Sequence, residues 1–128
     1  SYDVGKQLDR KRGYMDLDNY DYGSLFGTTF PMSKADRIST FDSGSTHAMT
    51  LTAVDLDKDG KPLKWKVENS WGASYGQQGC LIMTNRWFNE YMFRLVVNKK
   101  YVSEALLKEF EQKPTMLTYD DPLFQLED

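Results

Sequence analysis

Two strand-like segments around one polar turn constrain the fold of this chain more than any other feature. The turn is the run Asp57-Lys58-Asp59-Gly60, and in the strand-like residues 63–69 after it, residues 63–68 alternate between apolar and charged side chains. Such alternation is typical of a strand with one buried face. With residues 48–56 as the partner strand, the turn predicts an antiparallel hairpin.

The register of this hairpin brings two polar residues together. A turn centred near Lys58 sets Met49 opposite Val67 and His47 opposite Asn69. Directly opposed residues have Cβ atoms roughly 4.5–5.5 Å apart, within reach of a hydrogen bond between side chains. A slip of one residue would place the two side chains on opposite faces, so this prediction depends on the register.

A histidine held by an asparagine is one part of a cysteine-protease site. A cysteine reacts as its thiolate, which an adjacent imidazole stabilises. The imidazole needs a third group that fixes its tautomer and ring plane. An asparagine oxygen can accept from one ring N–H and leave the other nitrogen for the sulfur. A lone histidine such as His47 is more often a surface or core residue, but the residues after Asn69 favour the catalytic interpretation.

Residues 69–72 read Asn-Ser-Trp-Gly and are followed by Tyr75, Gly76 and Gly79. This segment resembles papain-like cysteine proteases, in which the indole, here Trp71, covers the His–Asn hydrogen bond. Within that group the chain is most similar to the bacterial aminopeptidase C and bleomycin hydrolase family. The similarity is carried by several segments, namely residues 3–6, 13–16, 25–27, 34–37, 46–49, 54–57, 64–72, 87–92 and 97–101.

The resemblance implies a fold and a partial active site. The expected fold class is α+β, the β-barrel-like lobe of the papain-like fold, with an antiparallel sheet and short helices. Residues 1–128 would form a single domain in which residues 115–128 are a C-terminal tail. Because family members run to several hundred residues, we expect a C-terminal catalytic fragment. The catalytic cysteine and the oxyanion-hole glutamine would lie upstream on the same polypeptide, so the fragment alone should be inactive.

The resemblance also assigns roles. His47 and Asn69 would be catalytic, and Trp71 would support the active site. The family tail enters the cleft, so the α-carboxylate of Asp128 would bind the ammonium of peptide substrates with a free N-terminus. Full-length members form hexamers. This chain departs from the family in its last residues, Leu126-Glu127-Asp128, where small apolar residues are usual, and at Cys80, where an aromatic residue is usual.

Composition excludes several classes of function. A formal net charge of −3 gives no general attraction to nucleic acid. No apolar run approaches the roughly 18 residues that span a membrane, and no signal peptide is recognisable. A single cysteine excludes an internal disulfide and suits a reducing compartment, so we expect a cytoplasmic protein. No cofactor and no metal are expected.

Two segments imitate other sites. Cys80 is the only thiol, but it lies in an apolar strand-like run without a local cation or helix N-terminus, which is typical of a buried structural cysteine. Residues 55–60 resemble the start of an EF-hand loop. Position 12 of that loop would be Lys66, where calcium needs a bidentate glutamate. We interpret residues 55–60 as a polar hairpin turn.

The remaining elements follow from caps and periodicity. Ser33 is expected to begin a short helix over residues 33–38, Thr84 a helix that contains Trp87, and Ser103 a helix that ends near residue 112. Two more strands are expected, at residues 79–83 and 93–97.

Two functions of different classes remain open at this point. The first is the C-terminal portion of a cysteine aminopeptidase that hydrolyses N-terminal residues by Cys-His-Asn catalysis. The second is a non-enzymatic β-rich interaction module that keeps a protease-like core. The upstream reading frame distinguishes them, because only the enzyme requires a cysteine and a glutamine there.

Overall fold

The structure is a computed structural model that describes residues 1–124. Short strands and helices alternate along the chain. In order they are β1 (Leu8–Asp9), β2 (Tyr14–Met15), α1 (Tyr22–Phe26), α2 (Lys34–Ser39), β3 (Thr50–Leu56), β4 (Pro62–Glu68), β5 (Cys80–Thr84), α3 (Asn85–Tyr91), the 3-10 turn η1 (Lys99–Tyr101), α4 (Glu104–Phe110) and the 3-10 turn η2 (Pro122–Phe124).

The strands form one five-stranded sheet in the order β1-β2-β5-β4-β3. The fold class is α+β, as predicted. The sheet is mixed, however, and not antiparallel throughout: β2 runs parallel to β5 through the pairs Tyr14↔Ile82 and Met15↔Met83. Parallel neighbours cannot be joined by a tight hairpin, so this pairing connects distant parts of the chain. The sequence does not predict this pairing, because a two-residue strand is too short to show an alternating pattern.

The central hairpin exists, but its predicted register is wrong. Val67 pairs with Leu51 and not with Met49, and a shift in pairing follows between Leu51 and Ala53. The turn explains part of the offset. The carboxylate of Asp57 accepts hydrogen bonds from the backbone N–H groups of Asp59 and Lys61, each at 2.8 Å. The loop is therefore built around the Asp57 side chain, as in an Asx turn, and is not centred on Lys58.

Helix α3 covers one face of the sheet and completes the core. Trp87 is fully buried against the side chains of Val67, Leu81 and Met83, which project from β4 and β5. The Trp87 indole N–H donates to the carbonyl oxygen of Lys6 at 2.8 Å. This bond satisfies the only polar atom of a large apolar side chain, as burial of tryptophan requires.

Helix α2 is fastened to the end of α3. The Lys34 ammonium donates to the carbonyl oxygens of Asn89 and Met92, at 2.9 and 2.6 Å. These are orphan carbonyl groups of a helix terminus, which need donors from elsewhere. Arg37 adds an ion pair with Glu90 at 2.7 Å. Burial lowers the pKa of Lys34 from its ordinary value.

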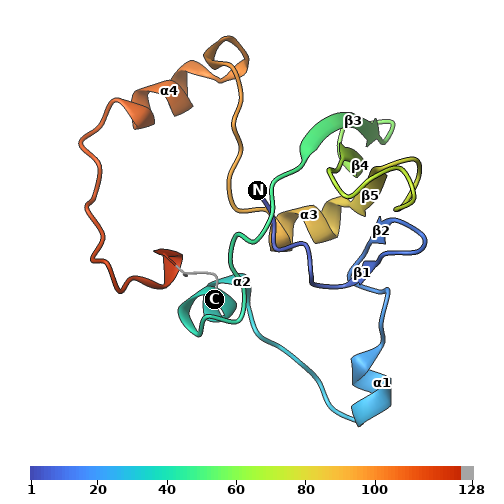
Figure 1. The fold of residues 1–128 in the computed structure, drawn as a ribbon. Coiled ribbons are helices and arrows are strands. Elements are labelled where there is room, and N and C mark those ends of the chain that lie inside the picture. Colours follow the sequence, from blue (N-terminus) through green and yellow to red (C-terminus); the bar gives the residue numbers. More distant parts are fainter. Residues whose placement is uncertain (125–128) are drawn as a thin grey trace.

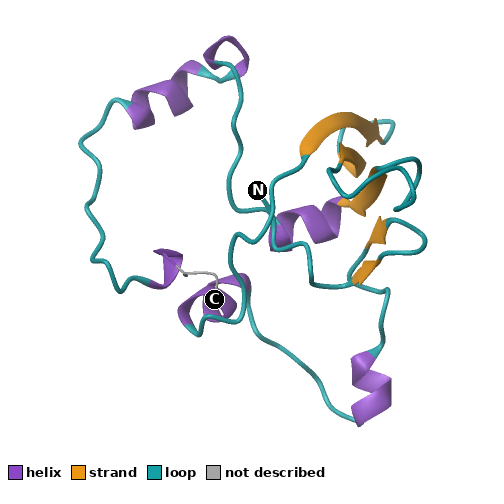
Figure 2. Ribbon diagram, in the orientation of Figure 1, coloured by secondary structure: helices purple, strands orange, loops and turns teal. Residues whose placement is uncertain are grey.

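The molecule divides into a body and two arms (Figure 1). The body comprises residues 1–19 and 33–93, and holds the sheet, α2, α3 and every buried hydrophobic side chain of residues 1–124. The first arm, residues 20–32, carries α1. The second arm, residues 94–124, carries α4 and extends away from the sheet. Its last element, η2, lies beside α2. The strands gather in the body, whereas α1 and α4 stand apart from them (Figure 2).

The helix caps behave as predicted, and one strand does not. Ser33, Thr84 and Ser103 each accept a backbone hydrogen bond at the start of α2, α3 and α4. The expected strand at residues 93–97 is wrong, since the structure has no strand there. Val96 is 99% exposed, because no neighbouring strand within residues 1–124 pairs with this segment.

No helix within residues 1–124 has both the length and the apolar character that a membrane span would need.

Candidate active site

His47 is held by the N-terminal segment and not by the hairpin. Its carbonyl oxygen accepts from the backbone N–H of Tyr2 at 2.8 Å, and its N–H donates to the Tyr2 carbonyl at 3.1 Å. Tyr2 is 2% exposed and packs against Trp87. The backbone of His47 is therefore attached to the core. Sequence reasoning missed this role of Tyr2, because a single aromatic residue in a polar segment gives no periodic signal.

Asn69 follows directly after β4 and meets His47 through its side chain. Its backbone N–H donates to the carbonyl of Gly79 at 2.9 Å, which fixes the end of the strand. The Asn69 Oδ1 lies 2.7 Å from the Nε2 of His47 and also accepts from the backbone N–H of Ser70 at 2.8 Å. The two residues that the sequence predicted to touch are therefore in contact.

This hydrogen-bond pattern selects one tautomer of the imidazole. The backbone N–H of Ser70 can only donate, so the side-chain atom of Asn69 that faces it is the oxygen. An amide oxygen only accepts, so the Nε2 of His47 carries the proton. In the neutral ring the Nδ1 then holds the free lone pair. Within residues 1–124 the Nδ1 makes no hydrogen bond, so it can accept a proton from another group.

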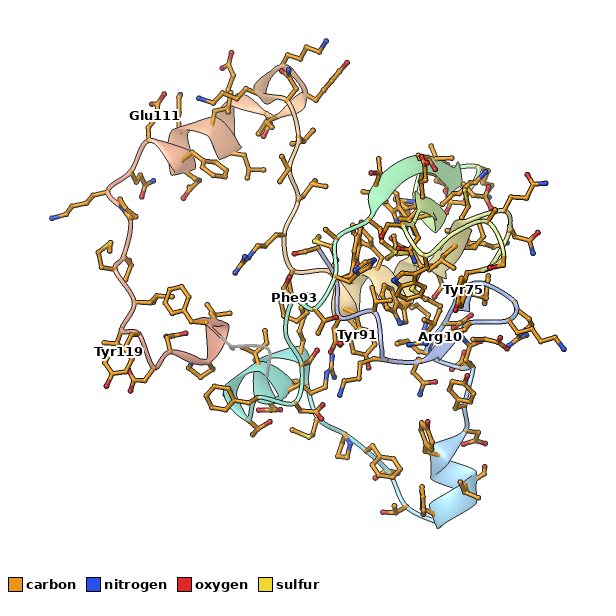
Figure 3. All side chains as sticks on the ribbon, viewed as in Figure 1. Arg10, Tyr75, Tyr91, Phe93, Glu111 and Tyr119 are labelled. Atoms are coloured by element: carbon orange, nitrogen blue, oxygen red, sulfur yellow. The ribbon has the colours of Figure 1, made fainter. Side chains whose placement is uncertain are left out.

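Trp71 covers the imidazole. Its ring is stacked on that of His47 with 5.2 Å between the centroids and 28° between the planes. The ring of Tyr75 meets Trp71 edge-on at 6.1 Å, and the guanidinium carbon of Arg10 lies 5.3 Å from the Trp71 centroid. Figure 3 shows Arg10 and Tyr75 on the same side of the body. An apolar cover lowers the local dielectric and so strengthens the hydrogen bond between His47 and Asn69.

The loop that carries Trp71 is tied down by two glycines. A Cβ on Gly13 would lie 2.4 Å from the Cα of Gly76, and a Cβ on Gly76 would lie 2.3 Å from the carbonyl oxygen of Cys80. Both glycines have positive φ angles, 67° and 58°. Only residues without a side chain allow the two backbones to approach this closely. The β1–β2 turn therefore fixes the position of the loop at residues 70–79, which contains Trp71.

The fold keeps the single thiol away from this pair. Cys80 pairs with Glu68 across β4 and β5, whereas Leu81 pairs with Val67 on the buried face. Because side chains alternate along a strand, Asn69 continues the face of Val67 and Cys80 lies on the other face. Among residues 1–124 the Cys80 thiol makes no hydrogen bond with the imidazole.

Two further sequence predictions have simple outcomes. The loop at residues 55–60 is a hairpin turn whose Asp57 carboxylate binds backbone N–H groups. Within residues 1–124 no group of three or more His, Cys, Asp or Glu side chains could hold a metal ion. The predicted substrate-binding residue Asp128 lies outside the described residues.

The pair is incomplete as a catalytic site. It contains an imidazole that can accept a proton and an amide that orients it, but residues 1–124 bring no nucleophile to the Nδ1 of His47. In addition, the Asn69 Nδ2 is buried without a hydrogen-bond partner among these residues. A buried donor without an acceptor costs free energy. Polypeptide or water outside the described residues can supply that acceptor.

Comparison with known proteins agrees with this architecture. A family model for the Peptidase C1-like family matches residues 1–124. The crystal structure of PepW from Lactobacillus rhamnosis superposes with a TM-score of 0.87 at 43% identity, over 98% of this chain and 29% of that one. The fold is that of one part of a papain-like peptidase. The chain belongs to the Peptidase C1-like family.

Curated relatives show which members of this family the chain resembles. The chain is 44% identical to aminopeptidase C from Lactococcus lactis subsp. cremoris over 121 residues, which cover 94% of this chain and 28% of the relative. It is 45% identical to human bleomycin hydrolase over 124 residues, which cover 94% and 27%. The resemblance to this family is thereby confirmed. The chain spans less than a third of the length of these relatives.

Proposed function

We propose that this chain supplies the general base and the orienting amide of a cysteine aminopeptidase. The observation that carries the proposal is the 2.7 Å contact between the Nε2 of His47 and the Oδ1 of Asn69 beneath the ring of Trp71. It leaves the lone pair of Nδ1 available for the thiol of a cysteine. That cysteine belongs to another part of the same polypeptide, as does the glutamine that would stabilise the oxyanion.

The chemistry of this pair follows from the tautomer. The Nδ1 takes the thiol proton, which gives a thiolate and an imidazolium. The thiolate attacks the scissile carbonyl carbon, and the imidazolium returns its proton to the leaving amine. Asn69 keeps the ring plane fixed during both transfers, since its oxygen accepts from Nε2 in the neutral and the charged ring. Water then hydrolyses the thioester with His47 as the base.

The substrates we propose are peptides with a free N-terminus. The α-carboxylate of Asp128 would pair with the substrate ammonium, a charge-assisted contact that is stronger than a neutral one. The side chains of Glu127 and Asp128 add further negative charge at this end. Removing the last few residues should lower the ratio of activity on free peptides to activity on N-acetylated peptides. An unchanged ratio would show that the carboxylate does not set this specificity. Cytoplasmic location, which the single cysteine favours, and hexameric assembly, which the resemblance implies, stay predictions.

The decisive experiment uses the full-length polypeptide and hydrolysis of an N-terminal residue from a peptide. His47→Ala should lower kcat by at least about 10³-fold, because no other group replaces the base. Asn69→Ala should be milder, by less than about 10²-fold, because the base remains but is less well oriented. Cys80→Ser is the matched control and should leave the rate unchanged. The isolated chain of residues 1–128 should show no thiol-dependent turnover.

Two results would contradict these roles. Turnover by the isolated chain that is lost in Cys80→Ser would make Cys80 the nucleophile. A folded full-length polypeptide that carries an upstream cysteine but hydrolyses no peptide would favour the interaction module instead.

A further inference from the structure

One basic side chain lies on the ring that covers the catalytic pair and makes no ion pair or hydrogen bond within residues 1–124. Arg10 lies on the turn between β1 and β2, and its guanidinium carbon is 5.3 Å from the centroid of Trp71. Trp71 is in turn stacked on His47 at 5.2 Å. Two successive ring contacts therefore connect Arg10 to the imidazole.

The turn that carries Arg10 is fixed in place. The carbonyl oxygen of Gly13 accepts from the backbone N–H of Ile82 at 2.8 Å. The close approach of Gly13 to Gly76 holds the turn against the loop of Trp71. Within the turn, the Asp9 carboxylate accepts from the backbone N–H of Arg12 at 2.9 Å. Arg10 is thus presented from a constrained turn and not from a free loop.

The charge of Arg10 is not neutralised. Its neighbour Arg12 donates to Asp9 at 2.6 Å and to Asn19 at 3.1 Å, so that guanidinium has partners. Arg10 is exposed, and within residues 1–124 it makes no ion pair and no hydrogen bond. Its planar guanidinium keeps all its N–H donors free, a geometry that suits bidentate binding of a carboxylate.

The position of Arg10 relates it to one end of the substrate. The imidazolium gives its proton to the leaving amine, so the leaving part of the peptide lies on the imidazole side of the scissile bond. Trp71 borders that side, and Arg10 lies on Trp71. Arg10 is thus two ring contacts away from the imidazole that serves the leaving amine.

We propose that Arg10 is a specificity-determining residue that favours peptides with a carboxylate on the leaving part next to the scissile bond. The carboxylate is either the side chain of an acidic residue directly after the bond or the α-carboxylate of a dipeptide. The inference rests on the proposed function, because it needs a reaction in which His47 protonates a leaving amine.

The test uses the full-length enzyme and matched peptides that differ only after the scissile bond. One pair carries Glu or Gln at that position, and a second pair is a dipeptide acid and its amide. The ratio of kcat/KM for Glu over Gln should fall about two- to fivefold in Arg10→Met, the size expected for an exposed ion pair. Arg10→Lys keeps the charge and should retain most of the preference. Lys11→Met, which removes the next positive charge on the same turn, is the matched control. The preference should also weaken with added salt.

The second pair identifies the source of the carboxylate. If Arg10→Met lowers the acid to amide ratio as well as the Glu to Gln ratio, Arg10 also binds the α-carboxylate of a dipeptide. If only the Glu to Gln ratio falls, Arg10 binds the acidic side chain alone. An unchanged Glu to Gln ratio together with an unchanged acid to amide ratio in Arg10→Met, with hydrolysis still dependent on His47, would overturn the role of Arg10 and leave the proposed function intact. An equal loss on charged and neutral peptides would do the same, because it would mean that Arg10 only supports Trp71. An enzyme inactive on every peptide would overturn the proposed function.

Discussion

The body and the two arms of this molecule form helices by the same local rules but bury them very differently. Helix α3 in the body and α4 in the second arm are both seven residues long and both begin at a hydroxyl cap. Trp87 of α3 is fully buried, whereas Phe110 of α4 is 81% exposed. In the first arm, Leu25 is 72% exposed. Caps therefore decide where a helix begins, and only tertiary partners decide whether its apolar side chains are covered.

The comparison with PepW suggests where those partners lie. The structural match covers 98% of this chain, so it includes both arms, but it covers only 29% of PepW. The arms thus share their layout with a much longer protein. Figure 3 shows Glu111 and Tyr119 of the second arm far from the labelled residues of the body. We infer that polypeptide beyond this chain covers the arms, whereas the body carries its own core.

The largest effect should come from the core of the body. Trp87→Ala removes a fully buried side chain and the hydrogen bond to the Lys6 carbonyl, and should cost about 3–5 kcal/mol of unfolding free energy. Chemical denaturation of the isolated chain and of the full-length polypeptide measures this loss. The loss should occur in both, because the core residues that pack with Trp87 belong to the body. A loss in only one of the two forms would contradict the idea of a self-contained core.

The next effect should appear in only one of the two forms. Phe110→Ala should change the stability of the isolated chain by less than about 0.5 kcal/mol, since the ring is exposed there. In the full-length polypeptide the same change should cost about 1.5–3 kcal/mol, the value for burial of a phenylalanine. Glu111→Gln on the same arm is the control. Equal results in both forms would mean that nothing covers α4.

The site was easier to predict than the fold around it. The contact between His47 and Asn69 was predicted from a register that is wrong by two residues where Val67 pairs with Leu51. Side chains return to the same face every second residue, so an even offset keeps the partners on one face. An odd offset would have placed the two side chains on opposite faces, and the predicted contact would then be wrong.

Long-range features left no comparable trace in the sequence. The parallel pairing of β2 with β5 and the bridge from Tyr2 to His47 join residues that are far apart along the chain. Neither depends on a periodic pattern. Residues 93–97 show the opposite case. Their apolar run predicted a strand, but within the described residues no neighbouring strand pairs with it. Strand-like sequence predicts extended backbone, and pairing needs a partner.

A third prediction concerns association of the isolated chain. Exposed apolar side chains on α1 and α4 should make it self-associate, because patches beyond a few hundred Å² are uncommon on monomers. Replacing both Leu25 and Phe110 by serine should weaken the association by about tenfold, which corresponds to about 1.4 kcal/mol. Sedimentation velocity over a range of concentrations measures the change. If the unsubstituted chain is strictly monomeric, this would contradict the inference that the longer protein covers the arms.

The smallest effect separates a buried charge of the body from the exposed charges of the arms. Asp3 is 4% exposed, and its carboxylate accepts a hydrogen bond from the Ser43 hydroxyl at 2.7 Å. Burial raises the pKa of Asp3 above its ordinary value of 3.8, although Ser43 and Lys6 act in the opposite direction. The folded state therefore binds the Asp3 proton more tightly than the unfolded state does.

The sign of the pH dependence follows from this linkage. The stability that Asp3 contributes is fully present below its unfolded pKa and is lost as the pH rises through the raised folded pKa. The difference in unfolding free energy between the unsubstituted chain and Asp3→Asn should therefore change with pH. It should become less favourable to the unsubstituted chain as the pH rises from about 4 toward neutrality. Urea unfolding of both chains at several pH values measures the difference, and Glu111→Gln, which changes an exposed carboxylate of the second arm, should show no such trend. If the native chain instead gained stability over Asp3→Asn with rising pH, the Ser43 hydroxyl and the nearby cations would outweigh burial. The body would then stabilise the ionised form of Asp3.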